Sequence, residues 1–403
     1  MAEDTAHLPA DEGRYPSSGD SVPDTHPSKW FTRCAGSQAY GGAGSVDPSH
    51  ENGPTSGEAL INGLDSRALL ACFLEHPPED FQVLAKQPMP VFSAVFDLLT
   101  AADDTSRAKA SRLPGYGWWS RWLRPRVAFA GSPVTEYAPL PLGVSAFRLV
   151  RKLRREMGHR HAMTVVKDLP HDSPLLSRAA NDQADDILQA CLNQGFFMVE
   201  GLPLAYVPID FTDVNTYLGR LPKSARRYVQ RRLRSRERMT VQRIATGEAF
   251  ADDALVAAYY ALYREVHDNS DIRFDCLTLP FFAALLRNET SGGFVFEYRH
   301  AESGDLLGWN LCFEVGGRLV DKYVGLSYPA SREMNLYFVS WIVNLEYALE
   351  RGLSHYVAGV TAGEVKTLLG ASFTPTRHAV YVRNPLLRLF MRRFSHWFSM
   401  TDQ

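Results

Sequence analysis

The chain has 403 residues, a length that fits two domains of ordinary size and a terminal tail. Apolar residues make up 45% and charged residues 22%, the balance of a soluble globular protein. The formal net charge of -2 argues against a chain devoted to nucleic-acid binding, so any contact with a polyanion must be local.

The cysteines and the apolar runs exclude further classes of protein. The five cysteines are scattered, without a C-x-x-C pair or a histidine at metal-ligand spacing. They indicate neither a zinc site nor a disulfide framework, and we expect no bound metal or cofactor and a reducing cytoplasm. The acidic N-terminus does not resemble a signal peptide, and no apolar run is long enough to span a bilayer. We therefore expect a cytoplasmic protein, soluble or at most bound to a membrane surface.

The amino-acid composition of the N-terminal part changes along its length. Residues 1–57 are crowded with Gly, Pro, Ser and Asp and lack apolar periodicity, which predicts a disordered tail. Order is expected to begin near Leu60, and the apolar spacing predicts a helix over residues 92–99. Residues 113–141 are rich in Trp, Pro and Gly and are interpreted as a packed connection.

From residue 147 onward the pattern alternates between helices and strands, as in α/β proteins. The middle of the chain predicts helices over 147–155 and 174–193, the latter ending before Gly195. A basic helix or helix pair, broken near Pro222, is expected over 213–239. Strands are expected between these helices at 162–166, 196–199 and 204–209.

The second half of the chain repeats this alternation more clearly. Two glycines, Gly316 and Gly317, predict a hairpin turn between strands 306–315 and 319–326, because glycine readily adopts positive φ angles. The other expected helices are 251–267, 280–287, 335–350 and 364–369, and the other expected strands are 294–298, 355–360 and 377–383.

Three stretches resemble a known family. They are YL…LPKSARRYVQRR ending at residue 232, the hairpin 308–325 followed by NLY at 335–337, and GEVKTLLGASF at 363–373 followed by TRH at 376–378. In this order they resemble the Fem-like branch of the Gcn5-related acetyltransferase (GNAT) superfamily, which includes peptidoglycan-peptide aminoacyltransferases. The resemblance implies an α/β (α+β) fold, a GNAT-like mixed sheet flanked by helices, with two tandem GNAT-like domains.

The resemblance also implies a division of the chain. The expected parts are a tail over 1–57, a degenerate first GNAT-like domain over 58–198, a GNAT-like acyltransferase domain over 199–385 and a C-terminal amphipathic helix over 386–403. The active cleft is expected mainly within residues 293–382.

The family implies a place for the donor substrate. In this fold the donor lies in a splayed gap between two strands, and its pyrophosphate lies at the N-terminus of the following helix, where free N–H groups favour anions. Here that place holds Arg332, Asn335 and Tyr337, without the glycines of the usual coenzyme A loop. Acyl-CoA and aminoacyl-tRNA therefore both remain open as co-substrates, and an ordinary capped helix with a surface arginine is the alternative.

The candidate catalytic residues are Asp321, Tyr323, Lys366 and His378, with Glu333 and Tyr356 as further candidates in the cleft. Asp321 and Tyr323 are expected to share one face of a strand, where Asp321 accepts an amine proton and Tyr323 orients the carbonyl. Lys366 occupies a position that the resemblance gives to a lysine facing the active groove, suited to an oxyanion or a phosphate. His378 is a candidate base near neutral pH. The alternatives are an ion-paired aspartate, a core tyrosine, a solvated lysine and a hydrogen-bonded strand histidine.

Two basic segments have two interpretations each. Arg226 and Arg227 lie in the arginine-rich helix, which binds phosphates of a nucleotide-bearing or tRNA substrate or else forms a solvated face paired with Asp252, Asp253 and Glu237. The C-terminal helix 386–403 mixes leucines and aromatics with arginines, a pattern that fits an anionic membrane surface or packing against the first domain.

These observations predict an acyltransferase. It moves an acyl or aminoacyl group from acyl-CoA or aminoacyl-tRNA to a small-molecule or peptide amine by direct attack in a ternary complex. A tailoring enzyme for a small natural product differs only in its acceptor. The alternative from another class is a non-catalytic GNAT-fold protein that binds a nucleotide-bearing ligand or RNA.

Overall fold

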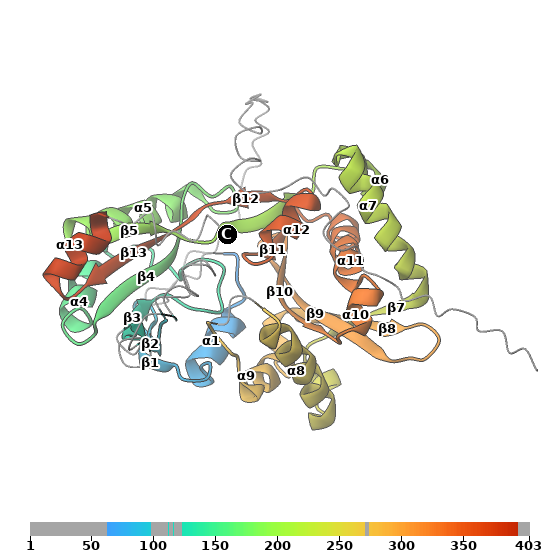
Figure 1. Ribbon diagram of the computed structural model, residues 1–403, viewed down its shortest axis with the longest axis horizontal. Coiled ribbons are helices and arrows are strands. Elements are labelled where there is room, and N and C mark those ends of the chain that lie inside the picture. The colour runs from blue at the N-terminus through green and yellow to red at the C-terminus, as the bar shows by residue number, and fades with distance from the viewer. Residues whose placement is uncertain (1–62, 98–111, 113–115, 117–122, 271–273, 394–403) are drawn as a thin grey trace, which may run out of the picture. The chain divides into compact units, whose positions relative to one another are not determined.

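The computed structural model describes residues 63–97, 112, 116, 123–270 and 274–393 (Figure 1). The predicted tail over 1–57 lies outside the described residues, as do parts of the Trp-rich segment and the last ten residues of the predicted C-terminal helix. Two mixed sheets flanked by helices make up the described part, which confirms the predicted α/β class.

The six-stranded sheet has the order β1-β2-β3-β4-β13-β5, and its only parallel pair is β3 with β4. The burial alternates along β5, whereas β2, β3 and β4 are runs of mostly buried residues. Their bounds are β1 Gln82–Ala85, β2 Val91–Val95, β3 Arg126–Ala130, β4 Met163–Pro170, β5 Phe197–Glu200 and β13 Thr376–Val382.

The seven-stranded sheet has the order β12-β6-β11-β10-β9-β8-β7, and its only parallel pair is β10 with β11. The predicted turn is confirmed, since Gly316 and Gly317 have φ angles of 54° and 70° between β9 and β10. The bounds are β6 Leu204–Pro208, β7 Met239–Ala245, β8 Gly293–His300, β9 Leu306–Val315, β10 Arg318–Leu326, β11 His355–Gly359 and β12 Ser372–Thr374.

The helices cover the faces of both sheets (Figure 1). The predicted break near Pro222 is confirmed, because one helix ends at Arg220 and the next begins at Lys223. The helices are α1 Arg67–Glu75, α4 Ala146–Glu156, α5 Arg178–Asn193, α6 Val214–Arg220, α7 Lys223–Leu233, α8 Asp253–Asp268, α9 Leu279–Leu286, α10 Ala330–Glu333, α11 Leu336–Glu350, α12 Gly363–Leu368 and α13 Pro385–Arg393, with 3-10 turns at Arg234–Arg238, Glu248–Phe250 and Glu289–Ser291.

Separate apolar clusters hold the layers together. One cluster packs α4 and α5 on a face of the six-stranded sheet, and a second packs α6, α7 and α11 on a face of the seven-stranded sheet. A third cluster joins the remaining faces of both sheets through α1, α8 and α9, and includes Phe92, Val165 and Trp309. Both sheets therefore share this third cluster.

The chain passes between the two sheets twice within a few residues. β5 belongs to the six-stranded sheet and β6 to the seven-stranded sheet, and β12 and β13 are divided in the same way. The last predicted strand, 377–383, thus forms as β13 but pairs with β4 and β5, outside the sheet that holds most of residues 199–385. The division of the chain at residue 198 stays a prediction.

The predicted helix over residues 92–99 is wrong, because residues 91–95 form the strand β2. Val91 to Ala94 are all buried, with Phe92 facing one core cluster and Val91 facing another. A short strand buried on both faces lacks the alternation that marks a strand, and its apolar run fits a helical template equally well.

Candidate functional site

The parallel strands β10 and β11 separate after a short paired stretch. Their pairing covers only residues 318–320 of β10 and 355–357 of β11, although β10 continues to Leu326. A cavity of about 750 Å³ lies at this gap and is lined by both strands and by the first turn of α11. The unpaired strand edges make this gap a natural place for a bound chain or acyl group.

A bulge in each strand explains why the pairing ends there. The register of β10 against β9 shifts at Lys322, and the register of β11 against β6 shifts at Ala358. A bulge adds a residue to one strand and bends it away from its partner. Gly359, at φ 79°, continues the bend of β11 with a conformation that suits glycine.

Asp321 lies at the start of the gap in a buried hydrogen-bond network. Its Oδ2 accepts from Asn344 Nδ2 at 2.9 Å and from Tyr356 Oη at 3.0 Å. Its Oδ1 accepts from Asn310 Nδ2 at 3.3 Å. These partners are neutral, and burial raises the pKa of the Asp321 carboxyl although the hydrogen bonds oppose the rise. The carboxyl is thus a better proton acceptor than an exposed aspartate.

Lys366 faces the same cavity from α12 and is 4% exposed. Its Nζ donates to the carbonyls of Ala358 at 2.5 Å and Gly359 at 3.0 Å, on the edge of β11. Burial lowers the pKa of Lys366 to about 8, while the nearby carboxylates of Glu136 and Asp321 oppose this shift. The solvated lysine that the sequence left as an alternative is therefore wrong, and the ammonium retains one N–H for a further acceptor.

Tyr323 lines the cavity. The prediction that Tyr323 and Asp321 share one face of the strand is wrong. The bulge at Lys322 pairs Asp321 with Cys312 and Tyr323 with Leu311, which belong to opposite core clusters. Tyr323 packs its ring against Phe281 and Phe282, and its buried hydroxyl lacks a partner among the described residues. The period-2 rule fails here because a bulge shifts the alternation by one residue.

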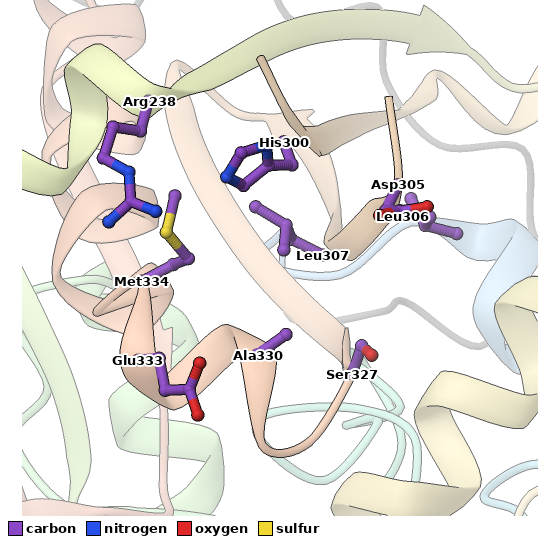
Figure 2. A pocket seen from close by; sticks show the side chains of 9 residues that line it. All are labelled: Arg238, His300, Asp305, Leu306, Leu307, Ser327, Ala330, Glu333 and Met334. Atoms are coloured by element: carbon purple, nitrogen blue, oxygen red, sulfur yellow. The ribbon is translucent and has the colours of Figure 1, made fainter. Parts of the chain in front are cut away.

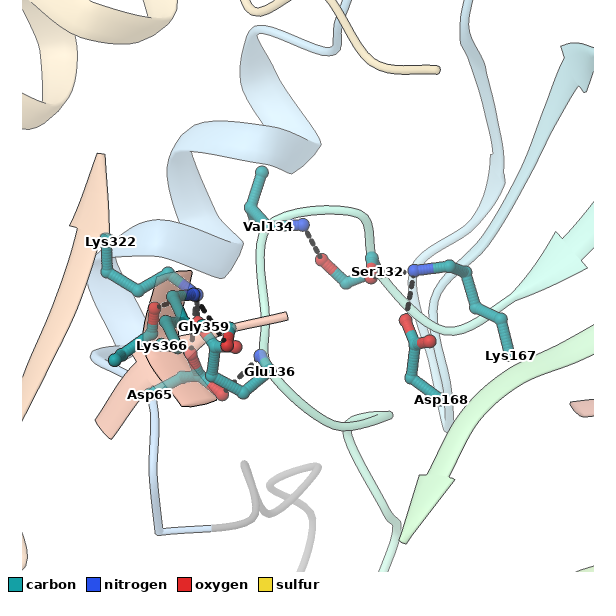
Figure 3. A network of polar contacts seen from close by, with 10 residues as sticks. Asp65, Ser132, Val134, Glu136, Lys167, Asp168, Lys322, Gly359 and Lys366 are labelled. Carbon is teal, nitrogen blue, oxygen red and sulfur yellow. Dashed lines mark hydrogen bonds and ion pairs between the residues drawn. The ribbon is translucent and has the colours of Figure 1, made fainter. Parts of the chain in front are cut away.

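Lys322 belongs to a buried ion-pair cluster in the cavity wall. Its Nζ lies 3.1 Å from Asp65 Oδ1 and 2.5 Å from Glu136 Oε1 (Figure 3). Burial raises the pKa of Asp65 to about 6, against the pull of the Lys322 ammonium. Figure 3 shows Lys366 and Gly359 beside this cluster, so one lysine is paired with carboxylates and the other with carbonyls.

His378 lies elsewhere on the cavity wall, together with Lys167 and Asp168. Its Nδ1 accepts a hydrogen bond from the backbone N–H of Asp168 at 2.9 Å, and burial lowers the pKa of His378. Asp168 has a φ of 55°, a strained angle for this residue, and pairs with Lys167. With Nδ1 engaged in this way, the proton of neutral His378 sits on Nε2, and the ring lacks a free acceptor nitrogen.

Only Tyr337 of the predicted substrate-binding residues lines this cavity. Arg332 stacks over the ring of Tyr328, with 4.4 Å between its Cζ and the ring centroid. Asn335 donates to Ser235 Oγ at 3.1 Å and adopts a left-handed conformation before α11. Tyr337 therefore lies at the gap, whereas Arg332 and Asn335 do not line it.

Arg226 and Arg227 lie on α7 and do not line the cavity between β10 and β11. They do not line the smaller cavity beside α10 either. Arg226 donates to the carbonyl of Gly219 at 3.5 Å, and Arg227 is exposed. Asp252 caps α8 and Asp253 pairs with Arg287, so the pairing of these acids with the basic helix that the sequence suggested is not observed.

A second cavity of about 510 Å³ lies beside α10 (Figure 2). Glu333, a further candidate from the sequence, lines it together with Arg238, His300 and Asp305. Glu333 is thus separated from Asp321 and Lys366, which line the larger cavity.

The sequence analysis missed the amides that hold Asp321. Asn344 is fully buried in α11, where its Nδ2 also lies 3.0 Å from Tyr356 Oη, and its Oδ1 accepts from Asn310 at 3.1 Å. A polar residue within the apolar run of α11 is a signal that the sequence carries, since buried polar groups need partners.

The described residues contain no cluster of three or more His, Cys, Asp or Glu side chains that can hold a metal ion. Within the same ranges, no helix has the length and apolar character needed to cross a membrane.

Comparison with known proteins gives distant likenesses. No family model matches the chain, and the search of curated proteins finds no match. Among solved structures, L-PGS from Bacillus licheniformis is 10% identical, with 83% of this chain and 97% of that chain covered and a TM-score of 0.45.

Two further structures carry names from the groups that the sequence resembles. FemX is 12% identical over 80% of this chain and 97% of its own, with a TM-score of 0.45. A tandem GNAT protein from the clavulanic acid biosynthesis pathway is 12% identical over 79% of this chain and 88% of its own, with a TM-score of 0.38. At TM-scores below 0.5 these likenesses are distant. The assignment of the chain to the α/β class rests on its two mixed sheets and the helices that flank them.

Proposed function

We propose that this chain is an acyltransferase that joins an acyl or aminoacyl group to an amine. One observation carries the proposal: β10 and β11 part around a cavity that presents a buried carboxylate, Asp321, and a buried ammonium, Lys366. Acyl transfer needs the donor carbonyl polarised, the amine deprotonated and both reactants held close together.

Asp321 is the proposed proton acceptor. As the amine nitrogen attacks the carbonyl carbon, the amine loses a proton to the carboxylate, whose pKa is raised by burial. Asn344 and Tyr356 hold the carboxylate in place. The bond from the carbonyl carbon to sulfur or oxygen then breaks, and the proton leaves with the thiol or hydroxyl product.

Lys366 is the proposed partner of the oxyanion. Two of its N–H groups are held by the carbonyls of Ala358 and Gly359, which fix the direction of the third. At neutral pH a lysine with a pKa of about 8 is mostly charged, so it can stabilise the negative charge of the tetrahedral intermediate. His378 fits the role of base less well, because its Nδ1 already accepts the Asp168 N–H.

Acyl-CoA and aminoacyl-tRNA both suit this arrangement as donors. The first turn of α11 lies at the cavity, and free N–H groups at a helix N-terminus favour a phosphate or another anion. The acceptor is a small molecule or a peptide with a primary amine. Incubation with acyl-CoA and charged-tRNA pools, each with a panel of amines, separates the donors.

Single-turnover rates of variants test the assignment. We expect Asp321→Asn to lower the rate by about 10²-fold to 10⁴-fold, the usual contribution of a positioned base. Tyr323→Phe is the matched control, because the Tyr323 hydroxyl has no partner among the described residues and should be dispensable for the proton transfer.

Full activity of both Asp321→Asn and Lys366→Ala would contradict the assignment. A protein that is thermally stabilised by a donor but shows no turnover with any amine would instead be a binding protein, because a ligand of the native state raises its apparent stability without chemistry.

A further inference from the structure

The six-stranded sheet contributes an apolar wall to the large cavity. β3, β4, β13 and β5 are neighbours in this sheet (Figure 1), and their register places four residues side by side across it: Phe129, Val165, Val380 and Phe197. All four line the cavity and are between 4% and 8% exposed. Phe92, the next residue of this row on β2, is fully buried and does not line the cavity. The row therefore leaves the closed core at β3 and faces the cavity.

Aromatic rings border one end of this row. Phe96 and Phe274 each pack edge-on against Phe129, with ring centroids 5.9 Å and 5.3 Å apart, and all three line the cavity. A wall of this composition favours an apolar ligand group, because the free energy gained on binding rises with the apolar area that is removed from water.

Polar side chains border the row along the strands. His378 precedes Val380 by two residues on β13, and Lys167 follows Val165 by two residues on β4, so each pair shares one face of the sheet. The Lys167 ammonium pairs with the Asp168 carboxylate (Figure 3). The charge of this lysine is thus already compensated within the protein.

The uncompensated charge in the cavity is negative. Lys167 and Lys322 pair with carboxylates. Among the described lining residues, two carboxylates, Asp275 and Asp321, and one lysine, Lys366, form no ion pair. Burial raises the pKa of Asp275 to about 6, which leaves its carboxyl mostly ionised at neutral pH. An acidic group on a ligand is therefore repelled at this wall, whereas an ammonium group is attracted.

We propose that this wall binds the acceptor, and that the acceptor is a primary amine with a compact apolar group and no acidic group. The apolar group lies on Val165, Val380 and Phe197, and the amine reaches Asp321 in the same cavity. The direction of the amine rests on the proposed acyl transfer, whereas the binding of the apolar group does not. The donor keeps the gap between β10 and β11, in the other sheet.

Calorimetric titration of the full chain with amines, without any acyl donor, tests the proposal. The probes are the alkylamines from propylamine to hexylamine, together with phenethylamine. Affinity should rise by about fourfold for each added methylene group, the gain expected when a CH2 leaves water. The amino acid phenylalanine adds a carboxylate to phenethylamine and should bind about tenfold more weakly or less.

Two neighbouring valines of β4 provide a matched pair of variants. Val165→Thr keeps the shape of the side chain and places a hydroxyl in the wall, so the affinity for hexylamine should fall by about fivefold to tenfold. Val166 is fully buried on the opposite face of the sheet, in the cluster with α4 and α5. Val166→Thr makes the same change there and should leave the affinity unaltered. Near-UV circular dichroism checks the fold of each variant, and alanine replaces threonine at both positions if either variant fails to fold.

Several outcomes would overturn the proposal. They are an affinity that does not depend on chain length, equal affinities of Val165→Thr and Val166→Thr for hexylamine, and tighter binding of phenylalanine than of phenethylamine. The last result would assign the wall to an acidic ligand.

The titrations also separate this proposal from the proposed acyl transfer. Apolar amines that bind as expected but accept no acyl group from any donor would contradict the transferase and leave the wall with its ligand. Acyl transfer to small polar amines such as ethanolamine, without binding of hexylamine, would support the transferase and overturn the acceptor class.

Discussion

The ammonium group of Lys366 is buried and donates hydrogen bonds to two backbone carbonyls. Burial lowers its pKa from 10.5 to about 8, because desolvation penalises the charged form. Between these two values the unfolded chain holds the proton and the folded chain does not, so this group makes stability rise with pH from about 8 to 10.5. Below about pH 8 the lysine is charged in both states.

The pKa of Lys366 gives a prediction for pH dependence. If the ammonium stabilises the oxyanion, the single-turnover rate should fall as pH rises through about 8, and Lys366→Met should be slow and lack this decrease. Titration of 13C-labelled lysines by NMR should show one signal that shifts near pH 8. Lys322 is the internal control, since its paired carboxylates raise its pKa. A flat rate profile in the unmodified protein would contradict this role.

At the scale of elements, α11 holds β10 and β11 in their separated arrangement. Asn344 of α11 donates to Asp321 of β10 and lies within hydrogen-bond distance of Tyr356 of β11. The two strands part just beyond this point. The Asn344 amide thus links the two strands through side chains at the point where their backbone hydrogen bonds end.

Asn344→Ala should destabilise the protein by about 1–3 kcal/mol, because it removes donors and acceptors from buried polar groups. Urea unfolding measures this change. Ser340→Ala, one turn earlier on α11, is the matched control, since the Ser340 hydroxyl only donates to the carbonyl of Tyr337. Equal losses in the two variants would mean that the buried network adds nothing beyond a local helix contact.

Across the whole molecule, Lys322 joins segments that are far apart in the sequence. It pairs with Asp65, just before α1, and with Glu136, after β3, from its position in β10. Glu136 lies in the connection between β3 and β4 of the six-stranded sheet, whereas β10 is central to the seven-stranded sheet. This cluster and the shared apolar core hold the two sheets against each other.

Lys322→Ala should cost about 3–5 kcal/mol of unfolding free energy, because it leaves two carboxylates buried without a cation. Arg220→Ala is the matched control: it breaks an exposed pair with Asp210 and should cost less than about 1 kcal/mol. Urea unfolding at neutral pH compares the two. The loss in Lys322→Ala should shrink as pH falls and Asp65, whose pKa is raised by burial, takes up a proton. A loss that is independent of pH would argue against unpaired charge as its cause.

Much of the fold in the second half of the chain could be predicted from local pattern. Three features each depend on a few adjacent residues: the glycine turn between β9 and β10, the break at Pro222 and the helix that begins after Asn335. The strand β2 could not, because burial on both faces removes the alternation that distinguishes a strand from a helix.

The sequence by itself determined the α/β class and brought Asp321, Tyr323, Lys366 and His378 to attention, and all four line one cavity. Only the tertiary structure decided how these side chains are placed relative to one another. The bulge at Lys322 turns Tyr323 away from Asp321, and the carbonyls of β11 bury Lys366. Bulges and desolvation depend on neighbours from distant parts of the chain, such as Asn344 and Glu136, so local periodicity carries no trace of them.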